Sequence, residues 1–324
     1  MGSSPNAANS YIFPEYTYNK KCAKLYVKKL TKYISRGDTM EKSGLIVEGG
    51  GMKCAYSAGI LDAFLDDNVT FDYCMGVSAG AANTASYLAG QRGRNLRFYI
   101  EHVKDPRYIS IKNLIKTGSL FGLQYIYGTL TNSTGNDPLD YDALAANPSE
   151  FHFPATNAAT GKAEYFSKED LGRDDYRGIM ATCALPGFCK PISFHGNYYY
   201  DGGVADSIPV ERAIADGCDK VVIIYCRPLG YVKQPESYRF LYKKMLRKFP
   251  NTITAIDNRH LNYRHSVEVA AKLQKEGRAF LFAPSHQVKI GTFTTDPKIM
   301  QELYDLGISD YKAQKDALRA FLNN

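Results

Sequence analysis

The 324-residue sequence contains no tryptophan, and it has no uninterrupted apolar run of the length, about 18 residues or more, that crosses a bilayer. An apolar segment of the signal-peptide type is also missing from the N-terminal region. The seven cysteines are odd in number, form no Cys-x-x-Cys pair and in several cases lie within apolar runs. These absences disfavour a membrane-spanning chain, a disulfide framework and a structural zinc site. They predict a soluble cytoplasmic protein without a bound metal.

Positive charge is concentrated near the N-terminus. Of the net charge of +7, residues 1–39 account for +5, because seven lysines and arginines stand there against Glu15 and Asp38. The remaining residues therefore carry a net charge of only +2. We interpret 1–39 as a basic leader outside the core fold, with Met40 as an alternative start. A basic excess confined to such an appendage, without an aromatic and basic sheet motif, does not predict binding to nucleic acid.

Short apolar runs alternate with helical patterns along the first part of the chain. Residues 43–51 (SGLIVEGGG) and 69–76 (VTFDYCMG) have the pattern of buried strands, and a helical pattern follows each of them. This order predicts an α/β fold with a mainly parallel central sheet and crossover helices. Further on, 220–226 (KVVIIYC) is the strongest predicted strand, and the pattern from residue 237 onward is mostly helical.

Ser78 lies in the segment GVSAG, residues 76–80, between the second predicted strand and a helix of small residues. A Gly-x-Ser-x-Gly segment at a strand-to-helix turn is typical of a nucleophile elbow, because the glycines allow the tight turn that exposes the serine hydroxyl. The N-terminal end of the following helix favours developing negative charge. A serine in this position is also typical of an ordinary helix cap, so the motif by itself leaves both interpretations open.

Three consecutive glycines, residues 49–51, follow the first predicted strand in the segment EGGGMK. The segment is not a P-loop, since Cys54 follows Lys53 where Ser or Thr is needed, and Cys54 also replaces the third glycine of a dinucleotide fingerprint. One glycine would be enough for a tight strand-to-helix turn. Three in a row favour an oxyanion hole, in which backbone N–H groups stabilise the tetrahedral intermediate of acyl transfer. The groups concerned are the N–H groups of Gly50, Gly51 and Met52.

An aspartate suited to act as the base for Ser78 occurs in the segment YYYDGG, residues 198–203. Asp201 comes at the end of a predicted hairpin strand, and the two glycines that follow let its carboxylate approach a serine closely. Taken alone, an Asp-Gly pair is more typical of a hairpin turn. The order of glycine loop, Gly-x-Ser-x-Gly and Asp-Gly-Gly along one chain is what favours a catalytic interpretation.

These three segments in this order resemble the patatin-like phospholipase family, and the likeness runs from about Gly44 to Tyr225, with a weaker likeness beyond. The sequence is most similar to a bacterial subgroup of cytosolic patatin-like esterases. The resemblance implies a three-layer α/β/α fold and a serine acyl hydrolase of esterase, lysophospholipase or phospholipase A type. Such an enzyme cleaves lipid or fatty-acyl esters without a cofactor. The residues that complete the motifs are Gly49, Lys53, Gly76, Gly80, Gly202 and Gly203.

The resemblance also implies roles and a division of the chain. Ser78 becomes acylated, Asp201 acts as the base of a dyad without histidine, and the 50–52 loop holds the oxyanion. Residues 40–226 form the catalytic core, and 227–324 form a mainly helical C-terminal region packed on it. Lys53 departs from the family pattern, since many members have arginine there. Lysine keeps the charge but not the bidentate fork, which puts headgroup contacts at this position in doubt.

Three alternatives stand beside this interpretation. A Ser-Asp-His triad needs a histidine after Asp201, but no glycine-rich strand end presents one of the candidates. A nucleotide-binding module is disfavoured by Cys54. A lipid- or partner-binding protein without activity is disfavoured by the presence of both Ser78 and Asp201. The histidines available for a triad are His260, His265 and His286.

Residues 237–249 (SYRFLYKKMLRKF) have the pattern of a basic amphipathic helix. Tyr238, Tyr242 and Met245 share its apolar face, and the lysines and arginines lie elsewhere on it. A helix of this kind can dock on anionic lipid, although its apolar face more often packs on the domain and its charges are solvated. Peripheral contact with a membrane is therefore an additional expectation.

Overall fold

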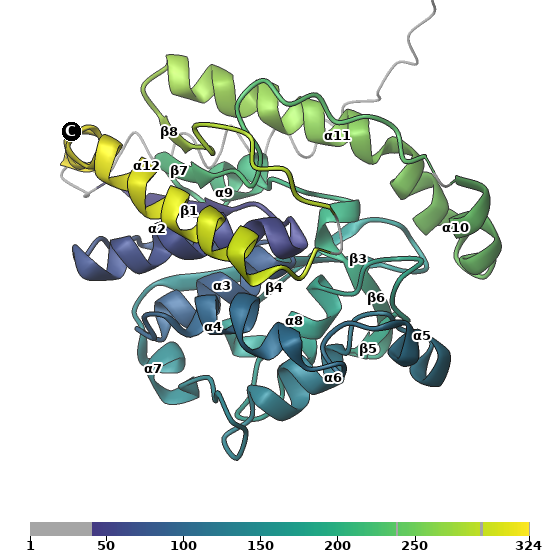
Figure 1. The fold of residues 1–324 in the computed structure, drawn as a ribbon. Coiled ribbons are helices and arrows are strands. Elements are labelled where there is room, and N and C mark those ends of the chain that lie inside the picture. Colours follow the sequence, from purple (N-terminus) through teal and green to yellow (C-terminus); the bar gives the residue numbers. More distant parts are fainter. Residues whose placement is uncertain (1–40, 238, 292–293, 324) are drawn as a thin grey trace, which may run out of the picture. The chain divides into compact units, whose positions relative to one another are not determined.

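A computed structural model describes residues 41–237, 239–291 and 294–323, and its centre is an eight-stranded β-sheet (Figure 1). The strand order is β5-β6-β3-β2-β1-β7-β8, and β4 pairs with β3 outside this path. The neighbours from β3 to β8 in this order pair in parallel, whereas β4, β5 and β6 pair antiparallel with their neighbours. The predicted leader 1–39 and Tyr238 lie outside the described residues. The strands are β1 (Ser43–Val47), β2 (Tyr73–Gly76), β3 (Glu150–Asn157), β4 (Ala163–Ser167), β5 (Ile192–Phe194), β6 (Asn197–Asp201), β7 (Lys220–Ile224) and β8 (Ala279–Phe282).

Helices cover both faces of the sheet, because successive side chains along a strand point to opposite faces. On β1, Leu45 and Val47 belong to an apolar cluster with α2, α3 and α12, whereas Ile46 between them belongs to a second cluster with α9 and α11. The predicted three-layer α/β/α fold with a mainly parallel sheet is therefore confirmed. The helices of these layers are α2 (Ala55–Asp66), α3 (Ala79–Leu88) and α12 (Pro297–Asn323) on one face, and α9 (Val210–Ala215) and α11 (Pro250–Lys275) on the other.

Short helices fill the connections between these layers. One of them differs from the sequence pattern: the helix predicted over 237–249 is α10 (Arg239–Met245), and a turn at 246–248 separates it from α11. Pro250 begins α11 and explains the break, since the residue before a proline is disfavoured in helical conformation. The other short helices are η1 (Gly51–Cys54), α4 (Arg94–Ile100), η2 (His102–Lys104), α5 (Ile111–Thr117), α6 (Leu123–Tyr125), η3 (Ile126–Leu130), α7 (Tyr141–Ala146), η4 (Lys168–Asp170), α8 (Arg177–Thr182) and η5 (Gly202–Val204).

Two strands meet end to end along one edge of β3. On this edge His152 pairs with Met75 of β2, and three residues later Ala155 pairs with Asp201 of β6. The opposite edge of β3 is occupied by β4 over the same residues. Since β2 runs parallel to β3 and β6 runs antiparallel to it, the C-terminal ends of β2 and β6 point toward each other. The turn that follows β2 and the last residue of β6 therefore come together at one point of the sheet.

The C-terminal helix α12 packs on α2 with almost no space between the two backbones (Figure 1). A Cβ added at Gly307 would lie 2.2 Å from the carbonyl oxygen of Tyr56, and one added at Gly59 would lie 2.1 Å from the carbonyl oxygen of Tyr304. The hydroxyl of Tyr304 also donates to Asp62 of α2 at 2.7 Å. Glycine is required at both contact points because no side chain fits there.

Candidate active site

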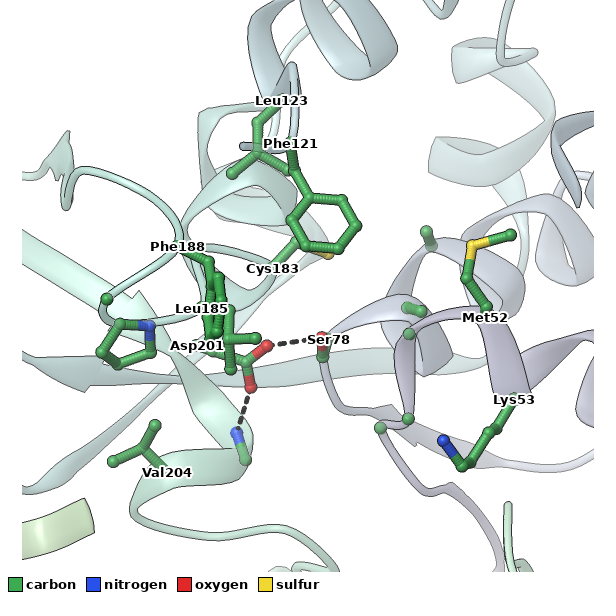
Figure 2. A pocket seen from close by; sticks show the side chains of 18 of the residues that line it. Met52, Lys53, Ser78, Phe121, Leu123, Cys183, Leu185, Phe188, Asp201 and Val204 are labelled. Atoms are coloured by element: carbon green, nitrogen blue, oxygen red, sulfur yellow. Dashed lines mark hydrogen bonds between the residues drawn. The ribbon is translucent and has the colours of Figure 1, made fainter. Parts of the chain in front are cut away.

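Ser78 occupies the sharp turn between β2 and α3. Its φ of 54° and ψ of −130° are a conformation that costs a non-glycine residue about 1–3 kcal/mol. The side chain accepts no hydrogen bond from the first turn of α3, so the helix-cap interpretation does not describe it. Its hydroxyl instead donates to Oδ2 of Asp201 at 2.6 Å (Figure 2). The backbone N–H of Ser78 donates to the hydroxyl of Thr182 at 3.0 Å, which holds the turn in place.

The two glycines of the Gly-x-Ser-x-Gly segment are both sites of close backbone approach. A Cβ added at Gly76 would lie 2.5 Å from the Cα of Ala81 in α3. One added at Gly80 would lie 2.6 Å from the carbonyl oxygen of Val47 at the end of β1. Glycine at these positions lets α3 begin directly against the ends of β1 and β2, which holds the serine at the strand ends.

Asp201 approaches Ser78 from the end of β6, at the point where β2 and β6 meet. Both residues are buried, with exposed fractions of 5% for Asp201 and 8% for Ser78. The second carboxylate oxygen, Oδ1, accepts the N–H of Gly203 at 2.8 Å, so each oxygen has a donor. At Gly202 a Cβ would lie 2.2 Å from the carbonyl oxygen of Pro154, which only glycine allows. The Asp-Gly-Gly segment therefore fixes the direction of the carboxylate.

Burial is the largest influence on the Asp201 carboxyl and raises its pKa above the usual range. The Arg259 guanidinium, the Ser78 hydroxyl and the Gly203 N–H favour the ionised form and oppose this effect. Arg259 comes from α11 and donates from Nε to the carbonyl oxygen of Gly203 at 2.6 Å. The sequence-based site missed Arg259, because no local motif marks it and its helix lies far along the chain from the other residues.

The glycine loop lies directly beside the turn that carries Ser78. A Cβ added at Gly49 would lie 3.0 Å from the Cβ of Ser78, and one added at Gly50 would lie 2.9 Å from the Cβ of Cys226. Gly51 has a φ of 56° and no heavy atom within 4 Å of an added Cβ. Three backbone N–H groups here donate no hydrogen bond within the described residues, so they are free to bind an oxygen atom of a ligand. They belong to Gly50, Gly51 and Met52.

A cavity of about 690 Å³ is lined by Ser78, Asp201 and the glycine loop. Figure 2 shows Asp201 on one side of Ser78 and Lys53 on the other, with Phe121 and Leu123 on a third side. The wall is mainly apolar and aromatic, but it also includes a group of charged side chains. Apolar and aromatic lining residues include Tyr99, Tyr108, Phe121, Leu123, Ile126 and Tyr127. The charged ones besides Asp201 include Lys53, Arg227, Lys233, Glu236 and Arg259.

In the described part of the chain, no histidine lines this cavity. His265 of α11 instead contacts Glu211 at 3.1 Å, at an exposed position. His260 and His286 are likewise absent from the cavity wall. The groups beside Ser78 therefore include a carboxylate and no imidazole.

Two kinds of feature, metal-ligand clusters and membrane-spanning helices, are absent from the described residues. The residues that the structure describes contain no group of three or more His, Cys, Asp or Glu side chains arranged to hold a metal ion. None of the helices formed by these residues is long and apolar enough to span a membrane.

The sequence that forms this site matches the model of a known protein family. The model of the family described as patatin-like phospholipase matches residues 45–214, slightly more than half of the chain. The chain belongs to the patatin-like phospholipase family. The matched segment contains the glycine loop, Ser78 and Asp201. A second model, for a domain of unknown function (DUF6363), matches residues 249–323, the part of the chain that supplies Arg259.

Individual relatives of this family member are distant. An uncharacterized Escherichia coli protein, YjjU, is 24% identical over 257 residues, which cover 76% of this chain and 71% of that protein. Lysophospholipase nte1 of Aspergillus terreus is 25% identical over 60% of this chain, which spans 12% of the length of that protein. The structure of human GIVD cytosolic phospholipase A2 with methyl gamma-linolenyl fluorophosphonate covers 94% of this chain and 63% of its own, at 12% identity and a TM-score of 0.47. Membership of the family rests on the family match and not on these distant similarities.

The buried Asp201 carboxylate should lower the stability of the folded protein at neutral pH. Because its pKa is raised on folding, the unfolded chain ionises more readily, and stability falls as pH rises through the unfolded and then the folded pKa. We therefore expect Asp201→Asn to raise the Tm by a few degrees at pH 7–8. The gain should vanish below about pH 4, where the carboxyl is protonated in both states.

Thermal unfolding of the two proteins across this pH range measures the effect. Asp305→Asn, at an exposed position of α12, is the matched control and should leave the Tm unchanged. If the Tm of Asp201→Asn at pH 7–8 is equal to or below that of the wild type, the buried carboxylate does not lower the stability of the folded protein.

Proposed function

We propose that this protein is a serine acyl hydrolase that cleaves carboxylic esters of lipids through Ser78 and Asp201. The observation that carries the proposal is the 2.6 Å hydrogen bond from the Ser78 hydroxyl to the Asp201 carboxylate, within a cavity lined mainly by apolar and aromatic side chains. The hydroxyl has a base in contact with it, and the cavity suits an acyl chain. Membership of the patatin-like phospholipase family supports a lipid substrate.

The chemistry follows from the positions of these groups. Ser78 Oγ attacks the ester carbonyl carbon while its proton passes to Asp201, and a tetrahedral intermediate forms. This intermediate collapses to an acyl-enzyme as Asp201 returns the proton to the leaving alcohol. Water then attacks the acyl group, Asp201 takes a proton from that water, and the fatty acid leaves as Ser78 recovers its proton. The raised pKa of Asp201 makes it a stronger base than an ordinary carboxylate.

The intermediate carries an oxyanion, which needs donors in place before the reaction. The N–H groups of Gly50, Gly51 and Met52 lie beside the serine turn and lack acceptors among the described residues. We assign these groups the role of oxyanion hole. The positive end of α3 adds to the favourable field at Ser78.

The proposed division of the chain is a catalytic core over 40–226 and a C-terminal region over 227–324. The proposed place of action is the cytoplasm, with peripheral contact at a lipid surface. Two observations support this location. The described cysteines are all free, as in a reducing compartment, and α10 carries exposed apolar side chains, Phe240 at 80% and Met245 at 49% exposure.

A second candidate is a lipid- or partner-binding protein of the same family without catalytic activity. The apolar cavity would serve such a protein equally well. It would not need a strained serine, a buried carboxylate in contact with that serine and free N–H donors beside it. We therefore favour the hydrolase, and the following experiments distinguish the two.

A fluorophosphonate probe should label Ser78 in the wild-type protein and should not label Ser78→Ala. Asp201→Asn should reduce hydrolysis of a p-nitrophenyl ester to near background, because the amide cannot accept the serine proton. His260→Gln, His265→Gln and His286→Gln should each keep most of the activity, since no histidine among the described residues lines the cavity.

Ser133→Ala is the matched control for this series. It breaks another serine–aspartate hydrogen bond of 2.6 Å, to Asp174, at an exposed position. Undiminished labelling of Ser78→Ala would exclude Ser78 as the nucleophile. A histidine variant as inactive as Asp201→Asn would replace the dyad by a triad.

Gly51→Val should lower kcat about 100-fold or more, the usual effect of losing one oxyanion donor. An added Cβ meets no heavy atom within 4 Å at this position, so we attribute the loss to a change in the φ of 56° and in the direction of the neighbouring N–H groups. Gly51→Asn should retain more activity, because asparagine tolerates left-handed backbone better than valine.

Initial-rate kinetics together with the Tm of each variant measure this effect. Gly230→Val is the matched control, since Gly230 also has a positive φ, of 83°, and open space, but does not line the cavity. A folded Gly51→Val protein with normal kcat would remove the loop from the mechanism.

We expect charge reversal on α10 and just after it to weaken binding to anionic phosphatidylserine vesicles by a factor of 10 or more. Each basic residue near such a surface contributes about 1 kcal/mol to binding. The variant carries glutamate in place of Lys243, Lys244, Arg247 and Lys248. All four side chains are exposed on or just after α10. Co-sedimentation with anionic and with zwitterionic vesicles measures the effect, and a short soluble ester checks that the site is intact. Unchanged binding to the anionic vesicles would mean that these charges are simply solvated.

A further inference from the structure

The long helix α11 is attached to the part of the core that carries the aspartate of the site. The buried hydroxyl of Thr252 donates to the carbonyl oxygen of Ala158 at 2.8 Å, in the turn that follows β3. About two helical turns further on, Arg259 lies on the same face of the helix and donates from Nε to the carbonyl oxygen of Gly203 at 2.6 Å. The helix therefore brings an arginine from a distant part of the chain to the Asp-Gly-Gly segment.

The guanidinium of Arg259 is held at two of its nitrogen atoms. Besides the bond from Nε, Nη1 lies 3.3 Å from Oε1 of Glu236, and the side chain is only 20% exposed. Gly203, which accepts the Nε bond, also donates its N–H to Oδ1 of Asp201 at 2.8 Å. One glycine is thus bound by Asp201 through its N–H and by Arg259 through its carbonyl group.

The third nitrogen of the guanidinium lies near the carboxylate, on the other side of Gly203. A Cβ added at Gly203 would lie 3.1 Å from Oδ1 of Asp201 and 3.4 Å from Nη2 of Arg259. Both charged groups are therefore close to one point, and glycine leaves that point empty. A positive charge at such a position stabilises an ionised carboxyl group. Burial raises the pKa of Asp201, and the charge of Arg259 is the largest of the influences that oppose burial.

The other titratable groups near Asp201 are neutral or already paired. Burial, and to a smaller extent the charge of Asp201, raises the pKa of the thiols of Cys183 and Cys189, so both thiols are neutral near pH 7. The carboxylate of Glu236 is occupied by two cations. Its ion pairs are those with Arg259 and Lys233, both at 3.3 Å. The ionisation of Asp201 therefore depends chiefly on burial and on Arg259.

We propose that Arg259 is a positioning residue for Asp201: it fixes the carboxylate through Gly203 and keeps a positive charge beside it. The proposal rests on the hydrolase function proposed above. It also gives the C-terminal region a role in the site, because Arg259 lies in the segment 249–323 that matches the domain of unknown function. The patatin-like model ends at residue 214 and does not include this arginine. The site is then complete only when both segments are present.

The pH dependence of kcat/KM measures this role, since its acidic limb reports the ionisation of the essential base in the free enzyme. Without the arginine the pKa of Asp201 rises further, so the base ionises only at higher pH. We expect Arg259→Met to move the acidic limb upward by about 1 pH unit or more, the usual effect of a nearby opposite charge. Hydrolysis of p-nitrophenyl butyrate, read at the isosbestic wavelength of p-nitrophenol, measures the limb without interference from the ionisation of the product.

Two further variants at the same position separate the charge from the hydrogen bond. Arg259→Lys keeps the positive charge but loses the planar fork, so its acidic limb should stay close to that of the wild type while kcat falls. Arg259→Gln keeps an N–H donor but has no charge, so its limb should move as in Arg259→Met. The Gly203 carbonyl group also accepts the hydroxyl of Ser207 at 2.6 Å, so it keeps a donor in every variant.

Arg278→Met is the matched control for the series. Arg278 also donates from Nε to a backbone carbonyl oxygen, that of Asp219 at 2.9 Å, and it is also partly buried. This contact lies before β7, whereas the site lies beyond the other end of that strand, and Arg278 does not line the cavity. The acidic limb of Arg278→Met should coincide with that of the wild type.

Thermal unfolding gives a second readout that needs no turnover. Asp201→Asn removes the buried carboxylate, and the resulting gain in Tm at pH 7–8 should be larger in an Arg259→Met background than in the wild type. The reason is that the carboxylate then lacks its nearby positive charge and lowers the stability of the folded protein more strongly. The Tm values of the wild type, the two single variants and the double variant measure this coupling.

Each possible outcome decides between the proposal and an alternative. An unmoved limb in Arg259→Met, with Ser78 still labelled by fluorophosphonate, overturns the proposal and leaves the hydrolase function in place. A limb that moves equally in Arg259→Lys and Arg259→Met also overturns it, because the charge is then irrelevant. A wild-type protein that neither hydrolyses esters nor reacts with the probe overturns the hydrolase function, and the Tm comparison then shows separately whether Arg259 stabilises the carboxylate.

Discussion

The hydrogen bond between Ser78 and Asp201 depends on a single feature of the sheet, the edge of β3 that two strands share. β2 delivers the serine turn from one direction and β6 delivers the aspartate from the other, and β3 holds both strands in register. The two residues are 123 positions apart in the sequence, yet their side-chain oxygens lie 2.6 Å apart. A shift of either strand by one residue would turn its side chains to the other face and separate the pair.

The site combines several arrangements that are unfavourable by themselves. A non-glycine residue with positive φ, a carboxylate with an exposed fraction of 5% and three N–H groups without acceptors among the described residues all lie around one cavity. The fold tolerates them because they lie where the ends of β1, β2 and β6 meet, between two helical layers. Under the proposed hydrolase function, the fold holds these groups in position before a substrate arrives.

Sequence reasoning reached the glycine loop, the serine turn and the aspartate because each has a local pattern with a physical cause. Glycines mark the places where backbones touch, as at Gly76 and Gly80, and those contacts are short-range in the chain or lie at predictable strand ends. The fold class followed from the alternation of strands and helices. The roles of Ser78 and Asp201 remain predictions.

The residues that sequence reasoning missed are long side chains that reach the cavity from distant elements. Arg259 contacts Gly203 from α11, and Arg227 and Lys233 belong to a connection without a regular pattern. The spacing of such residues along the sequence does not show which way their side chains point. The early end of α10 was missed for a different reason: the apolar period continues past Met245, and the effect of Pro250 on the residues before it outweighs that period.

The contact between α2 and α12 has a consequence for the region matched by the domain of unknown function. Gly59 and Gly307 bring the two helix backbones together, and α2 follows directly after the loop that carries the free N–H groups. The last helix therefore cannot loosen without uncovering the helix on which that loop depends. The C-terminal segment is therefore an integral part of the fold. Its removal would disturb the serine turn through the contacts of α12 with α2 and of α2 with η1.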